Sequence, residues 1–219
     1  MAICPECKSN NCNVLTQLFD WNKNYNCFLN GVYPKCVCKD CGHIFIDNSD
    51  IKTIFKEEWL SIKSNKGYTF LHEEKANGKL ICVIPYRQNN GNMEYLMRYE
   101  ICPAHGDEHE FCMIIGSYDN VDLTIEETVV KELREETGYI VDQSKLQSLD
   151  WVWDSKVADT KVYLFTIDLT NLKSYEPLTD GTELEKTAYC KWVSLEECYK
   201  CKDPKAFVIL HKMKEGENK

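Results

Sequence analysis

The sequence contains no apolar run that approaches the ~20 residues needed to cross a bilayer as a helix. It begins with MAICPECK, which lacks the basic start and apolar centre of a secretory signal peptide. Basic residues are not in excess either, because 35 Asp and Glu against 26 Lys and Arg give a formal charge of −9. These absences predict a cytoplasmic protein with no membrane partner, and they speak against tight binding to the phosphates of nucleic acid.

The sequence has enough chain for one large domain or two smaller ones, with 219 residues of which 43% are hydrophobic. Cysteine is abundant, at 13 residues. Because the number is odd and no secretory signal is present, metal binding in a reducing compartment is favoured over a disulfide framework.

Four of the cysteines form two CxxC pairs, Cys4 with Cys7 and Cys38 with Cys41. Each pair places two thiolates on a tight turn, and two such turns supply the four sulfurs of a tetrahedral structural Zn²⁺ site. A segment this short holds little core of its own, so bound zinc would provide its folding energy. We therefore predict a small zinc ribbon over residues 1–48; the alternative is a set of redox-active or unligated thiols.

The ribbon does not have a basic surface, since residues 1–49 contain four lysines and four acidic residues. This balance makes nucleic acid an unfavoured partner. We therefore expect the ribbon to act as a scaffold or to form the contact of a homodimer.

Residues 49–66 are expected to form a connecting helix and a linker. The helix would run from Asp50 to Ser64, with Ser49 or Asp50 as its N-cap. Its apolar residues recur at helical spacing: Ile51, Ile54, Phe55, Trp59 and Ile62.

The most informative stretch runs from Thr124 to Tyr139 and reads TIEETVVKELREETGY. Thr124 and Glu127 have the spacing of a capping box, in which each side chain satisfies the other's backbone donor. Gly138 is the residue type most often found just past a helix end. With apolar residues at helical spacing between them, these signals predict a helix of about three to four turns.

The last turns of this predicted helix carry Glu132, Glu135 and Glu136 on one side. Like charges at this spacing repel by roughly 0.2–0.5 kcal/mol per pair, and the C-terminal end of a helix disfavours anions. A bound cation explains such a cluster, and carboxylate ligands suit Mg²⁺ or Mn²⁺. The alternative is a solvated acidic face that Lys131 and Arg134 partly compensate.

The segment KELREETGY resembles the second half of the Nudix box, which runs Arg-Glu-aliphatic-x-Glu-Glu-x-Gly-aliphatic. Gly116 stands near the position of the family's first glycine, one residue early. Two further positions depart from the pattern. Lys131 replaces the arginine and loses its bidentate fork, and Leu123, beside Asp122, occupies the place of the first glutamate.

This resemblance implies an α/β fold, a Nudix α/β/α sandwich with a mixed sheet, over residues 67–219. A zinc ribbon in front of such a domain is similar in architecture to NADH pyrophosphatases. The implied activity is Mg²⁺- or Mn²⁺-dependent hydrolysis of the pyrophosphate bond of a nucleoside diphosphate linked to another moiety, such as NAD(H) or ADP-ribose. The two departures leave an alternative, a weak or inactive Nudix domain that binds a nucleotide as a sensor or adaptor.

The resemblance also implies roles at the site. The three glutamates would hold the metal ion, with Glu132 as a candidate base, while Lys131 orients carboxylates and the backbone at Gly116 lines the site. Family members usually draw another carboxylate from outside the box. Glu183 and Glu185, before the last predicted strand, are the candidates, and the alternative is that both are exposed loop charges.

Four residues near the site are of types that bind zinc: Cys102, His105, His109 and Cys112. Their spacing matches no common zinc-binding pattern, so contact with substrate or solvent is expected rather than a second metal site.

The rest of residues 67–219 is predicted as strands and closing helices. Leu80–Tyr86 is a nearly continuous apolar run, as for a strand covered on both faces. The turn signal Asn89-Asn90-Gly91-Asn92 leads to its partner strand, Met93–Tyr99. The other predicted elements are the strands Phe111–Ile115, Leu146–Trp153, Lys156–Leu169 and Tyr189–Val193, and one or two helices within Leu195–Lys214.

Overall fold

The structure is a computed structural model that describes residues 8, 12–15, 35–41, 44–46, 51–178 and 185–217. It divides into two compact units, Met1–His72 and Glu73–Lys219. None of the helices in these described ranges has the length and apolar character that a membrane span requires.

The first unit contains a small antiparallel sheet in the region of the predicted ribbon. Its strands are β1 (Cys12–Leu15), β2 (Lys35–Cys38) and β3 (Ile44–Ile46), in that order. Cys38 is buried at the end of β2, and Cys41 is exposed in the turn that follows. Cys4 and Cys7 lie outside the described residues, so the four-cysteine site stays a prediction.

The helix predicted over residues 50–64 is wrong, because this segment forms strands. β4 (Ile51–Lys56) and β5 (Leu60–Asn65) pair antiparallel and are joined in one sheet by β6 (Tyr68–Glu73). A bulge between Thr53 and Phe55 interrupts the alternation of β4, which leaves apolar residues at spacings that also suit a helix. The next turn uses positive φ at Lys66 and Gly67, which favours a hairpin over a continued helix.

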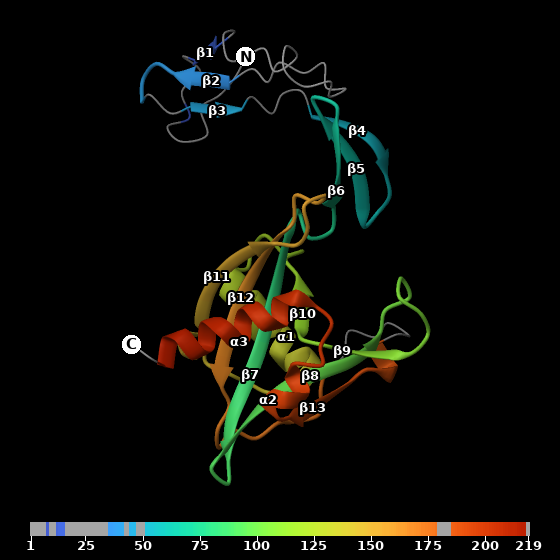
Figure 1. The fold of residues 1–219 in the computed structure, drawn as a ribbon, viewed down its shortest axis with the longest axis vertical. Helices are drawn as coiled ribbons and strands as arrows, with labels where there is room; N and C mark the ends of the chain where they lie inside the picture. Colours follow the sequence, from blue (N-terminus) through green and yellow to red (C-terminus); the bar gives the residue numbers. More distant parts are fainter. Residues whose placement is uncertain are drawn as a thin grey trace. The chain divides into compact units, whose positions relative to one another are not determined.

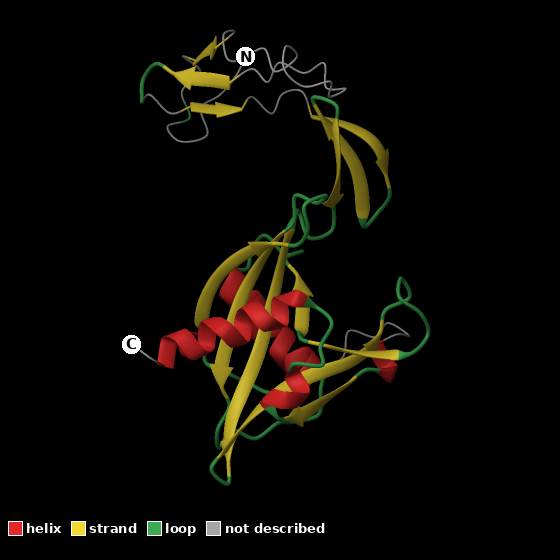
Figure 2. Ribbon diagram, in the orientation of Figure 1, coloured by secondary structure: helices red, strands yellow, loops and turns green. Residues whose placement is uncertain are grey.

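The second unit is built on one mixed sheet, with the strand order β11-β12-β7-β8-β13 (Figure 2). β10 and β9 pair with β7 and β8, respectively. Among the described strands of this sheet, β7 and β12 pair parallel and the other pairs are antiparallel. The strands are β7 (Lys79–Asn89), β8 (Asn92–Ile101), β9 (His109–Cys112), β10 (Ile114–Ser117), β11 (Gln147–Trp153), β12 (Lys161–Asp168) and β13 (Tyr189–Val193). The hairpin of β7 and β8 is confirmed, whereas the strand predicted at Phe111–Ile115 is split at Met113.

Helices cover both faces of this sheet (Figure 1). On β7, Ile81 and Val83 point into the cluster under α1 (Ile125–Thr137), while Cys82 and Ile84 point into the cluster on the opposite face. The latter cluster is closed by α2 (Leu195–Cys198) and α3 (Pro204–Glu217). This alternation explains why β7 is apolar throughout, and it confirms the predicted α/β/α sandwich.

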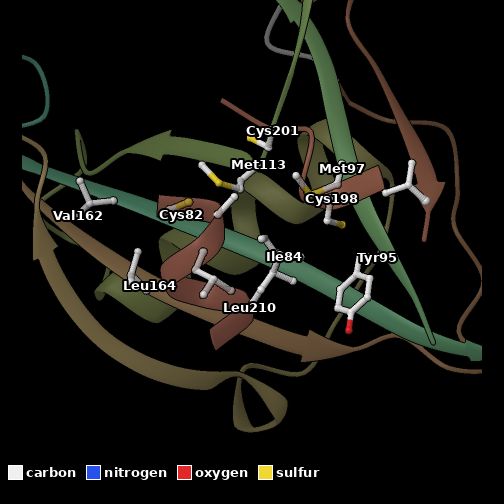
Figure 3. Close-up of a cluster of buried hydrophobic side chains, with 13 residues drawn as sticks. Cys82, Ile84, Tyr95, Met97, Met113, Val162, Leu164, Cys198, Cys201 and Leu210 are labelled. Atoms are coloured by element: carbon white, nitrogen blue, oxygen red, sulfur yellow. The ribbon is translucent and has the colours of Figure 1, made fainter. Parts of the chain in front are cut away.

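The core on the α2 and α3 side is rich in sulfur (Figure 3). Cys198 and Cys201, which form a third CxxC pair, are buried there with Met97 and Met113. Burial raises the pKa of the Cys198 thiol to about 12, so this group stays protonated and inert at neutral pH. The pair therefore serves packing.

α1 begins and ends where the sequence predicts. The Thr124 hydroxyl accepts a hydrogen bond from Glu127 N (3.1 Å), and the Glu127 carboxylate accepts one from Thr124 N (2.7 Å). Gly138 follows the last turn with φ of 72°, in the left-handed region. A Cβ at Gly138 would overlap the backbone carbonyl of Tyr175. The backbone N–H of Tyr175 donates a hydrogen bond to Gly138 O (2.9 Å).

Gly138→Ala should therefore lower the free energy of unfolding by about 2 kcal/mol or more, because the new methyl group meets backbone and the residue must keep positive φ. Urea denaturation followed by circular dichroism measures the change. The matched control is Gly216→Ala in α3, where nothing lies within 4 Å of an added Cβ. The control should be neutral or stabilising by up to ~1 kcal/mol, and equal losses in both variants would contradict the packing described.

Candidate active site

Three glutamates on the second half of α1 are partly buried instead of facing solvent. Val129 and Leu133 anchor α1 on the sheet and are fully buried. The side chains of Glu132, Glu135 and Glu136 retain only 13%, 25% and 14% of their exposure. A solvated acidic face does not describe side chains held this closely against the protein.

Gly116 makes room for the first of these glutamates. It lies in β10 directly beneath Glu132, where an added Cβ would overlap Cγ and Cδ of Glu132 and lie 2.8 Å from Oε1. The Glu132 side chain therefore packs directly on the backbone of β10, and any residue larger than glycine at position 116 would take the space that Glu132 occupies. The structure thus brings Gly116 and Glu132 together.

Lys131 lies between two of the glutamates. Its Nζ is 2.9 Å from Glu135 Oε2 and 3.4 Å from Glu132 Oε1. Burial raises the pKa of Glu132, and the nearby charges of Glu135 and Asp119 add to this effect while Lys131 opposes it. The pKa of Lys131 is raised, because its contacts with Glu135 and Glu132 outweigh its own desolvation.

Arg98 is a residue of this site that the sequence analysis missed. It lies in β8, is only 4% exposed, and places Nη1 3.0 Å from Glu136 Oε2. Its Nε donates to Glu100 Oε2 at 2.7 Å. The pKa of Arg98 is raised despite its burial, because Glu136 and Glu100 favour the charged form. The sequence did contain a signal for it: Arg98 is a charged residue that directly follows the apolar run YLM in a strand expected to be buried, and a buried charge needs a partner.

The two departures from the box lie around the turn before α1. Leu123 is partly buried, and its carbonyl accepts a hydrogen bond from the hydroxyl of Tyr118 (2.7 Å). Asp122 is exposed and its N–H bonds to the side chain of Asn120 (3.0 Å). Leu123 thus closes the loop through its backbone at the place where a carboxylate was expected.

The candidate residues outside α1 are placed as follows. Glu183 lies outside the described residues, as does the side chain of Glu185 at the start of the turn Glu185–Thr187. His105 Nδ1 lies 2.7 Å from Glu110 Oε2, and His109 Nε2 lies 2.9 Å from Thr187 O. Each histidine thus has a partner within the protein, a nearby one for His105 and one distant in the sequence for His109.

The carboxylates of α1 have the ligand chemistry of a hard divalent cation. As the side chains stand, no group of three or more His, Cys, Asp or Glu residues within the described ranges is arranged to hold a metal ion. Lys131 and Arg98 engage the glutamates instead. The ligand types fit Mg²⁺ or Mn²⁺, and Lys131, which pairs with two of the carboxylates, has a side chain that is 40% exposed.

Comparison with known proteins bears on the family and the fold. The NUDIX domain matches residues 81–213, which is more than half of the chain. A solved structure described as "Crystal structure of ADP compounds hydrolase" is similar, with a TM-score of 0.57 and 14% identity over 76% of this chain and 91% of that chain. At this identity the likeness concerns the fold alone. No curated protein sequence matches.

The matched region contains β10, α1 and the strand of Arg98, and hence the whole glutamate site. Nudix hydrolases act on small nucleotides and generally use Mg²⁺ or Mn²⁺, and the domain supports an enzyme of the Nudix pyrophosphohydrolase type. On this evidence the chain belongs to the Nudix domain family.

Proposed function

We propose that the protein hydrolyses the pyrophosphate bond of a nucleoside diphosphate linked to another moiety, such as NAD(H), ADP-ribose or a related nucleotide. The observation that carries the proposal is the seating of Glu132 over Gly116, with Glu135 and Glu136 on the same side of α1. Partly buried carboxylates in a row are costly unless a cation binds them. A pyrophosphate group needs such cations to approach a protein of charge −9.

Mg²⁺ or Mn²⁺ bound to these glutamates would neutralise the phosphate oxygens and lower the pKa of a water molecule. The protein contributes position. Glu132 Oε1, held against β10, is the proposed acceptor of the water proton, and the desolvation that raises its pKa makes it the more basic. Lys131 keeps the carboxylates of Glu132 and Glu135 together until the ion arrives.

A second candidate function is nucleotide binding without hydrolysis. It is favoured by the turn at Leu123, where an apolar side chain stands in place of the first box glutamate. The full chain should be incubated with Mg²⁺ and a panel of NADH, ADP-ribose, dinucleoside polyphosphates and nucleoside triphosphates. Products resolved by chromatography support the hydrolase, whereas affinity without products supports a sensor.

Glu132→Gln should lower kcat about 10²–10³-fold on whichever nucleotide the panel identifies, because it removes a metal ligand and the proton acceptor while keeping the shape of the side chain. Steady-state kinetics at saturating Mg²⁺ measure the loss. Glu126→Gln is the matched control on the first turn of the same helix and should keep kcat within about twofold. Full activity of Glu132→Gln would contradict the assignment.

Gly116→Ala should produce the same loss of kcat as Glu132→Gln, since its methyl group displaces the Glu132 side chain. The free energy of unfolding should fall as well, by about 1–3 kcal/mol for overpacking at a closed site. Kinetics and urea denaturation on one preparation measure both. A Gly116→Ala variant with unchanged kcat would show that activity does not depend on the packing of Glu132 against Gly116.

We also propose that the first unit binds one structural Zn²⁺ through Cys4, Cys7, Cys38 and Cys41, as in a zinc ribbon. The placement of two of these cysteines supports the proposal: Cys38 ends β2 of the antiparallel β1–β2–β3 sheet, and Cys41 lies in the turn that follows. A ribbon in front of a Nudix domain keeps NAD(H) among the substrates to test, by its similarity to the NADH pyrophosphatases.

Purified protein should contain about one zinc per chain by elemental analysis, because four thiolates complete one tetrahedral site. Cys38→Ser should lose that zinc, whereas Cys102→Ser, the control, should retain it. Zinc retained in Cys38→Ser would refute the assignment. Light scattering on the same samples measures the molar mass and so tests whether the first unit joins two copies of the chain into a homodimer.

A further inference from the structure

Arg98 joins the catalytic helix to the sheet through two different edges of its guanidinium. Nη1 faces Glu136 Oε2 at 3.0 Å, and Nε donates to Glu100 Oε2 at 2.7 Å. Glu100 lies two residues along β8, so both residues project from the same face of the strand. One planar group thus connects α1 and β8, through an ion pair with Glu136 and a hydrogen bond to Glu100.

The strands on either side of Arg98 present cysteines to it. Cys112 on β9 and Cys190 on β13 are its register partners. Burial raises the pKa of both thiols, that of Cys190 to about 12, so they flank the guanidinium as uncharged groups. Cys190 also donates from Sγ to the backbone carbonyl of Glu136 (3.6 Å). The end of α1 is thereby held at both its backbone and its side chain.

The three glutamates are divided between two cations of different character. Lys131, 40% exposed at its side chain, pairs with Glu132 and Glu135. Arg98, 5% exposed at its side chain, pairs with Glu136. A guanidinium cannot lose its proton in a protein, and its fork fixes direction as well as charge. A buried guanidinium anchored by Glu100 is thus better suited than a flexible ammonium to orient one carboxylate.

We infer that Arg98 is a positioning residue that, anchored by Glu100, aims the carboxylate of Glu136 into the metal and pyrophosphate site. The inference rests on the proposed function for the identity of that site. Arg98 acts through Glu136 and through no contact of its own with the nucleotide. Glu100, in turn, fixes the rotation of the guanidinium.

The test is a titration with Mn²⁺ alone, measured by electron paramagnetic resonance, on the full chain and its Arg98→Lys variant. Lysine keeps the charge and loses the second anchor, so the Kd for Mn²⁺ should rise about 10–100-fold, the usual cost of losing a partner that orients a ligand. Glu100→Gln weakens the same anchor and should shift the Kd in the same direction by a smaller factor. Arg98→Met is avoided because it would leave Glu136 as an uncompensated buried charge and could prevent folding.

The matched control is Arg87→Lys. Arg87 lies on β7 and pairs with Glu94 of β8 through Nη2 (2.6 Å) and Nε (2.7 Å), and its ion pair involves none of the three glutamates of α1. Its substitution should leave the Kd for Mn²⁺ within about twofold, which separates orientation of the ligand from a general effect of arginine loss on the sheet. An equal rise of the Kd in both variants would overturn the inference.

Kinetics give a second readout on the identified nucleotide. Arg98→Lys should lower kcat about 10–100-fold while KM changes less than about threefold, because the metal ligand and not the substrate contact is disturbed. A raised KM with unchanged kcat would mean that Arg98 binds substrate directly, and an unchanged Kd for Mn²⁺ would mean that it orients nothing; either result overturns the inference. Should no nucleotide be hydrolysed, the proposed function fails while the Mn²⁺ titration still decides the role of Arg98.

Discussion

The site depends on keeping three carboxylates close together on a partly buried helix side. Such a row is unfavourable by itself, because like charges repel and desolvation disfavours each ionised group. The protein offsets this cost with two cations, Lys131 on the helix and Arg98 on the facing strand, each within ion-pair distance of the glutamates. The caps of α1 and its packing on the sheet place the helix where those contacts are made.

The ion pairs of the three glutamates require that α1 be fixed both in its position along the helix axis and in its rotation about that axis. The capping box at Thr124 and the left-handed turn at Gly138 determine where the helix begins and ends. Val129 and Leu133 then set its rotation, since both must enter the core above β7. With these constraints met, Glu132 has a single place to lie, over the residue of β10 that lacks a side chain.

Sequence reasoning located the elements whose signals are local. The caps of α1, the Asn90-Gly91 hairpin and the doubly buried β7 follow from residues that are neighbours along the chain. The segment 51–65 was assigned to the wrong class, because a bulged strand and a helix leave apolar residues at similar spacings over so short a run. The hairpin turn at Lys66-Gly67 was the better evidence.

Arg98 could not be placed at the site from the sequence, because its partner Glu136 is 38 positions away (136 − 98) and meets it only when β8 lies under α1. A charged residue in a buried strand predicts that some partner exists, and it does not say which carboxylate that partner is. The glutamates themselves were found because a helix repeats every 3.6 residues, so their shared side is written into the spacing. Long-range ion pairs have no such period.

The two cations differ in how readily they give way. Lys131 is 40% exposed, and an ion pair of this kind contributes about 0–1 kcal/mol, so a divalent ion in the proposed site would meet little resistance at Glu135. Arg98 is buried, and separating a buried pair by removing one partner costs about 3–5 kcal/mol. The carboxylate of Glu136 is therefore held more firmly than that of Glu135, and in the proposed metal site it would be the more rigid of these two ligands. Lysine at the box position would suit this division in the proposed metal site, because a flexible ammonium yields to a metal ion more easily than a bidentate guanidinium does.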